Sequence, residues 1–161
     1  MRVLLLAEAC NPEWVSVPLE GWSHSRAIAS LVDTHLVTQI RNRDAIVRAG
    51  LQEGGEFTAI NSEAVEGPVY RLAAKLRGGA GVGWTTLAGL SALSYPYYEH
   101  LVWKQFGKRI QAREFDIVHR ITPLSPTATS LIAPRCQKAG VPFVMGPSSP
   151  FPSRQISDSD C

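Results

Sequence analysis

The chain has 161 residues, of which 45% are hydrophobic and 19% are charged, and its formal net charge is +2. This length is typical of one domain with a real core, and the composition excludes an intrinsically disordered chain. The small and scattered positive charge argues against nucleic acid as a partner, because nucleic-acid-binding domains concentrate lysine and arginine on one face.

Membrane spans and metal sites are not predicted either. The apolar run that follows Met1 is broken at Glu8, which makes it shorter than the ~7–15 residues of a signal-peptide core. No other segment reaches the roughly 20 apolar residues of a spanning helix, so any membrane contact is expected to be peripheral. The cysteines are odd in number and lack metal-ligand spacing, which predicts a reduced, cytoplasmic protein without a bound metal. They are Cys10, Cys136 and Cys161.

The first 60 residues alternate between strand and helix patterns. Residues 3–7 are apolar on both faces, as in a central parallel strand. Ser23 is predicted to cap the first helix, which covers residues 23–32, and a second helix is predicted over 43–49. Two further strands are predicted over residues 35–40 and 56–60. This alternation predicts right-handed crossovers in a parallel sheet.

The middle of the chain is predicted to be helix and loop. Residues 69–77 form a basic amphipathic pattern, and the glycine-rich residues 78–83 are interpreted as a connector. A dinucleotide-binding loop is rejected there, because that motif needs a preceding strand and a different glycine spacing. The next helix carries a stripe predicted to face the core. Its members are Tyr98, Leu101, Val102, Phe106 and Ile110.

The last third predicts a strand over residues 115–119 and another over 141–145. Between them, Ser125 and Pro126 predict a helix start, Pro134 predicts that the helix is kinked or shortened, and Gly140 predicts the end of the helix. Residues 148–161 are rich in serine, proline and aspartate and predict a polar, disordered tail. The expected domain therefore spans residues 1–147, as an α/β fold with a Rossmann-like, open, mostly parallel sheet and helices on both faces.

His119 is the main candidate for a functional residue. It ends a predicted strand, and side chains at the carboxyl ends of strands face the ligand crevice in open α/β sheets. Arg120 is expected to point to the opposite side if the strand continues. Gly21 is interpreted in two ways: it lets a ligand approach a helix N-terminus, or it only lets a loop enter a helix. The other histidines, at 24, 35 and 100, are predicted to lie on surfaces without a special role.

Six segments together resemble the N-terminal domain of family 4 glycosyltransferases. The resemblance spans about residues 1–147, and its most specific part is Asp116-Ile117-Val118-His119 with the extension Arg120 to Pro126. The other segments are Val3-Leu4-Leu5-Leu6, Glu20-Gly21-Trp22-Ser23, Leu76-Arg77-Gly78-Gly79, Trp103-Lys104-Gln105-Phe106-Gly107 and residues 141–147.

The resemblance implies a retaining transfer of sugar from a nucleotide-sugar to an acceptor, without a metal or any other cofactor. It implies a two-domain enzyme with the active site in the cleft between the domains. His119 is then expected to contact the donor sugar, and Gly21 to lie by the diphosphate. The remaining substrate-binding candidates are Glu20, Trp22, Arg120 and Thr122.

Two departures from the family pattern change the expectation. Ser148-Ser149-Pro150 stands where the family has Asn-Gly-Gly, and no segment resembles the donor-binding second domain. Holding two reactants in position can lower the reaction barrier by ~7–11 kcal/mol. This domain forms only one wall of the cleft, so we expect a truncated enzyme that is inactive alone. Two alternatives stay open: a non-catalytic binding or assembly module that pairs with a separate donor-binding subunit, and an unrelated flavodoxin-like ligand binder.

Overall fold

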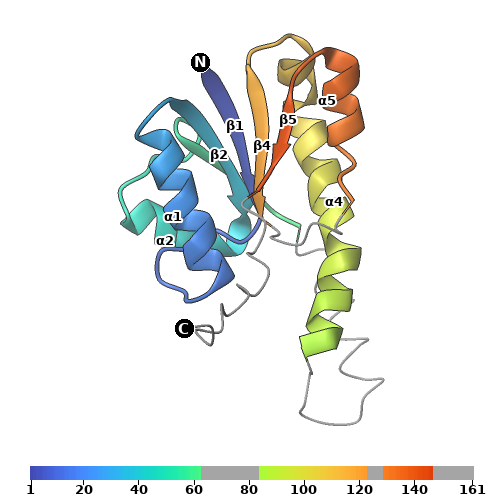
Figure 1. Cartoon of the computed structure of the whole chain (residues 1–161). Helices are drawn as coiled ribbons and strands as arrows, with labels where there is room; N and C mark the ends of the chain where they lie inside the picture. Colours follow the sequence, from blue (N-terminus) through green and yellow to red (C-terminus); the bar gives the residue numbers. More distant parts are fainter. Residues whose placement is uncertain (63–83, 123–128, 147–161) are drawn as a thin grey trace, which may run out of the picture.

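A computed structural model describes residues 1–62, 84–122 and 129–146 of the chain. They form a five-stranded sheet in the order β3-β2-β1-β4-β5, in which every pair of neighbouring strands is parallel (Figure 1). The strands are β1 (Arg2–Ala7), β2 (Asp33–Gln39), β3 (Phe57–Ile60), β4 (Ile117–Thr122) and β5 (Phe143–Met145). Within these residues, no helix is both long and apolar enough to cross a membrane.

Helices cover both faces of the sheet, which confirms the predicted fold class. α1 (Val17–Ala29) and α2 (Arg43–Arg48) lie on one face, with the short 3-10 turn η1 (Ile40–Asn42) before α2. α4 (Trp84–Gln111) and α5 (Ala133–Ala139) lie on the other face. Figure 1 shows that the first part of α4 extends past the carboxyl edge of the sheet.

The central strand β1 explains why the sheet needs helices on both sides. Leu5 and Ala7 belong to the core cluster on the α1 face, while Leu4 and Leu6 belong to the cluster on the α4 face. All four side chains are fully buried. Successive side chains in a strand point to opposite faces, so an unbroken apolar run requires apolar cover on both.

The predicted core stripe of α4 is confirmed. Tyr98, Val102, Phe106 and Ile110 are fully buried, and Leu101 packs against the same cluster. The Tyr98 hydroxyl donates a hydrogen bond of 2.9 Å to the carbonyl oxygen of Val37 in β2. Helical spacing therefore identified this face, and the phenol ties α4 directly to the sheet.

Two predicted helix boundaries are wrong. α1 begins at Val17, six residues before the expected cap at Ser23, and Pro18 lies in its first turn. α5 begins at Ala133, with Pro134 in its first turn, so the helix before Gly140 is short, as one of the two expectations for Pro134 had it, and Pro134 does not kink it. A proline is compatible with the first turn because the N–H groups there have no helical partner. Gly140 ends α5 as predicted, with a φ of 69°.

Several predictions lie outside the described residues. They are the basic helix at residues 69–77, the glycine-rich connector at 78–83, the helix start at Ser125 and Pro126, and the polar tail at 148–161. Residues 129–132, which the predicted helix would have included, are not helical.

Two cysteines are part of the core. Cys10, on the loop after β1, and Cys136, in α5, are both free thiols and fully buried. Burial raises the pKa of Cys10 to about 12, and a hydrogen-bonding contact with Ser25 only partly offsets this. Burial raises the pKa of Cys136 to about 11.

The prediction that His35 lies on the surface is wrong. His35 is only 3% exposed, because β2 is an inner strand and this side chain faces α4. Its Nδ1 atom lies 3.1 Å from the carbonyl oxygen of Gly55, and its Nε2 atom lies 2.8 Å from the Thr58 hydroxyl. The ring centroid is 5.4 Å from that of Phe106. Burial lowers the pKa of His35 below its ordinary value.

We therefore expect His35 to make folding sensitive to acid. Since its pKa is lower in the folded state than the unfolded value of 6.5, the unfolded chain binds the extra proton first. The stabilisation is fully present above pH 6.5 and is lost as the pH falls through that value toward the lower pKa of the folded state. Urea unfolding of the wild type and of His35→Gln between pH 7.5 and 5 measures this, with the exposed His100→Gln as control. An unchanged pH slope in His35→Gln contradicts the prediction.

Candidate functional site

The exits of β1 and β4 lie side by side at the carboxyl edge of the sheet. The two strands are parallel neighbours, and Ala7 is level with Thr122. The Thr122 hydroxyl accepts a hydrogen bond from the Ala9 amide at 3.1 Å and donates one to the Ala9 carbonyl at 3.3 Å. Thr122 thus joins the loop after β1 to the end of β4, as expected for two segments that leave the same edge.

Gly21 lies inside α1 and not at a helix N-terminus, so neither interpretation of this residue holds. A Cβ atom at this position would lie 2.2 Å from the Ala9 carbonyl oxygen and 3.1 Å from Cγ2 of Thr122. Both distances are below normal van der Waals contact. Gly21 is required because it lets α1 approach the exits of β1 and β4.

The neighbours of Gly21 on α1 differ in their surroundings. Glu20 is half-buried in the first turn, where the positive end of the helix dipole stabilises its negative charge. Trp22 packs against the core on the α1 face, and the Arg26 guanidinium lies 5.7 Å from the centre of its ring. These contacts give Trp22 a role in packing.

His119 lies within β4, which continues three residues further to Thr122, so the predicted strand end is wrong. The residue is level with Leu5 of β1 and Val144 of β5, and its half-buried ring points to the α1 face. Its Nε2 atom lies 2.8 Å from the carbonyl oxygen of Gly146, just after β5. Burial lowers the pKa of His119, the Gly146 carbonyl opposes this shift, and a charge on nearby His24 lowers the pKa further.

Arg120 points to the opposite face, as expected for a strand that continues. Its side chain is 2% exposed, and the guanidinium lies 5.6 Å from the ring centre of Tyr95 on α4. Its backbone carbonyl accepts a hydrogen bond of 3.0 Å from the Gly146 amide. The sheet therefore separates the Arg120 side chain from the His119 ring, and the two cannot contact the same small ligand group.

A buried carboxylate was missed by the sequence analysis. Glu99 of α4 is fully buried, and its oxygens accept hydrogen bonds from the Ser130 hydroxyl and the Leu131 amide. The Ser130 bond measures 2.6 Å. A signal was present, because Glu99 precedes Val102 by three residues and so falls beside the stripe that faces the core. Glu99 anchors the segment before α5, and we assign it a structural role.

The described residues hold no group of three or more histidine, cysteine, aspartate or glutamate side chains that could bind a metal ion. The polar side chains of α1 and β4 on this face of the sheet include the half-buried imidazoles of His24 and His119.

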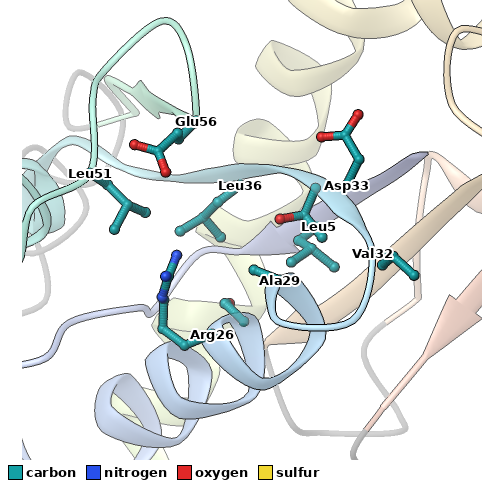
Figure 2. A pocket seen from close by; sticks show the side chains of 10 residues that line it. Leu5, Arg26, Ala29, Val32, Asp33, Leu36, Leu51 and Glu56 are labelled. Carbon is teal, nitrogen blue, oxygen red and sulfur yellow. The ribbon is translucent and has the colours of Figure 1, made fainter. Parts of the chain in front are cut away.

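The cavity in Figure 2 lies away from this edge. It has a volume of about 220 Å³ and is lined by α1, the start of β2 and the loop before β3. Arg26 and Glu56 reach it from opposite sides, and Asp33 places it toward the amino end of β2. Arg26 and Glu56 both have partners: Arg26 stacks over Trp22, and Glu56 accepts a 2.9 Å hydrogen bond from the Gln52 amide. We assign this cavity no function.

Comparisons with known proteins identify no relative. No family model matches the chain, and no characterised protein or solved structure matches it.

The close approach at Gly21 predicts that Gly21→Ala destabilises the fold. The added methyl group meets a backbone oxygen, which cannot rotate away, so α1 must shift. Such overpacking typically costs roughly 1–3 kcal/mol of unfolding free energy. The measurement is chemical denaturation. Gly55→Ala is the matched control, because the nearest atom to its Cβ position is 3.8 Å away. Equal stabilities for the two variants contradict the prediction.

Proposed function

We propose that this fold is the acceptor-side half of a nucleotide-sugar-dependent retaining glycosyltransferase. The observation that carries the proposal is the environment of His119. Its ring lies on the α1 face of β4, next to the strand whose exit loop meets β4 at Thr122. The carboxyl ends of β1 and β4, three residues beyond His119, lie where the strand order reverses, and ligands of parallel α/β sheets bind outside such ends.

The hydrogen bond to Gly146 defines what His119 can do. A backbone carbonyl only accepts hydrogen bonds, so the Nε2 atom that faces it carries the proton. Burial favours the neutral ring, and a neutral ring with its proton on Nε2 has an unprotonated Nδ1. Nδ1 is therefore an acceptor, which suits a hydroxyl group of a sugar.

In the proposed reaction, the bond between the anomeric carbon and the diphosphate oxygen breaks, and the same carbon bonds to a hydroxyl oxygen of the acceptor. The nucleoside diphosphate leaves with the electron pair, and the hydroxyl proton is released. His119 positions the donor sugar by accepting a hydrogen bond from it. No diphosphate contact is assigned to Gly21, because its position is filled by packing against Ala9.

Donor and acceptor must be held between two walls for this reaction. The sheet edge supplies one wall, and we propose that a donor-binding lobe, on further polypeptide or on a separate subunit, supplies the other. Holding the two reactants in the right position can lower the barrier of such reactions by ~7–11 kcal/mol. The described edge alone is therefore expected to bind substrate weakly and to catalyse little transfer.

The proposal predicts weak binding of a nucleotide-sugar at His119. In NMR titrations of the isotope-labelled chain with UDP-glucose and GDP-mannose, we expect shifts in the signals of His119 and Gly146. A Kd on the order of 1 mM, or about −4 kcal/mol, is expected for one wall of a cleft. His119→Ala should weaken the binding at least several-fold.

Two further variants make this test specific. His100→Ala changes an exposed histidine of α4 and should bind like the wild type. His119→Gln keeps a side-chain amide near the Gly146 carbonyl, so it reports on binding if His119→Ala disturbs the end of β5. No shift with either compound, or binding that is unchanged in both His119 variants, contradicts the proposed function.

A further inference from the structure

Five cations share the outer surface of α4, α5 and the turn that follows α4. Lys104 and Lys108 each lie two residues from buried positions of α4 such as Phe106, so their side chains point away from the sheet. Within the part of the chain that the structure describes, no carboxylate forms an ion pair with any of the five. We call this surface the basic face, and its cations are Lys104, Lys108, Arg113, Arg135 and Lys138.

Direct contacts join α4 and α5 into one surface (Figure 1). The Arg135 guanidinium of α5 lies 5.1 Å from the ring centre of Trp103 on α4. The same indole lies against Gly107, whose Cβ position is 2.8 Å from the ring. After α4, Nε of Arg113 donates a 3.3 Å hydrogen bond to the carbonyl oxygen of Ala139 at the end of α5. Because these contacts fix the two helices against each other, the five charges act together.

The basic face lacks the acidic residues that neutralise cations elsewhere in this fold. On the α1 side of the sheet, Nε of Arg48 lies 2.8 Å from a carboxylate oxygen of Glu13. By contrast, α4 and α5 contain a single carboxylate, that of Glu99, which is fully buried. Glu114, after α4, is paired with Arg109 at 2.7 Å. The five charges of the basic face exceed the formal net charge of +2, so the rest of the chain is net negative.

The composition of the basic face favours an anionic surface over a protein or a nucleic acid. Three of its five cations are lysines, which are depleted in protein–protein interfaces. Single-stranded nucleic acid is bound by grooves with aromatic rings on which bases stack, whereas the Trp103 ring is already stacked with Arg135. Long, flexible cations on the outer surface of two helices suit a bilayer leaflet, because anionic headgroups attract them without requiring a defined shape.

We propose that the basic face docks the protein on a bilayer surface that contains anionic lipids. This proposal goes beyond the function proposed above and does not depend on it. The lipid charge attracts the basic face and repels the net negative remainder of the chain, which orients the molecule. In that orientation the α1 side of the sheet, where the His119 ring lies, is turned away from the lipid.

Vesicle flotation of the full chain tests the proposal. We expect the protein to float with vesicles made of equal parts of phosphatidylcholine and phosphatidylglycerol, and to remain unbound with phosphatidylcholine alone. Raising the salt to about 1 M, where the screening length is roughly 3 Å, should release the bound protein.

Matched double variants locate the contact on the protein. Lys104→Gln with Lys108→Gln should weaken binding to the anionic vesicles about 25-fold, since each cation near such a surface strengthens binding roughly fivefold. Arg43→Gln with Arg48→Gln removes the same charge from the α1 side and should leave binding within about twofold of the wild type, because charges beyond the screening length of roughly 10 Å act weakly. Lys104→Arg with Lys108→Arg keeps the charge and should bind like the wild type.

Several outcomes would overturn the proposal. Equal losses in the two glutamine double variants show that net charge, and not this face, controls binding. Equal binding to neutral and anionic vesicles, or binding to neither, excludes docking by charge. A mixed-sequence DNA duplex at the same salt forms the last arm: tighter binding to the duplex than to the vesicles assigns the basic face to nucleic acid instead.

Discussion

The close approach of α1 to the sheet at Gly21 is the constraint on which the candidate site depends. Only a residue without a side chain allows the helix to lie this near the Ala9 carbonyl and the Thr122 methyl group. The Thr122 hydroxyl holds the other side of the contact by bonding both backbone groups of Ala9. Because this contact fixes α1 over β4, it holds the helix on the face of the sheet that carries the His119 ring. A glycine whose immediate effect is on packing therefore determines how closely this face is covered.

Much of the fold could be predicted from the sequence because its signals are local. The apolar run of β1, the buried stripe of α4 and the end of α5 at Gly140 all follow from side-chain periodicity or backbone conformation. The start of α1 was misplaced because Pro18 was not recognised as a first-turn residue, and Pro134 lies in the first turn of α5 where an interior position was expected. A proline is compatible with the first turn of a helix but disrupts its interior, and the local sequence did not distinguish these two positions.

The candidate site was less predictable because its contacts join distant parts of the chain. His35 was expected on the surface, but its burial follows from the order of the strands, which makes β2 an inner strand. His119 was placed correctly on the strand that follows α4, yet its bond to Gly146 depends on the pairing of β4 with β5. This pairing leaves no spacing signal in the sequence.

The buried thiols have a practical consequence for following this fold in solution. The thiolate is the form of cysteine that attacks alkylating reagents, and the raised pKa values keep Cys10 and Cys136 protonated near neutral pH while burial hides their sulfur atoms. Modification at these two positions must wait for the surrounding core to open. Site-resolved mass spectrometry of iodoacetamide-treated protein would therefore time local opening separately at the exit of β1 and within α5.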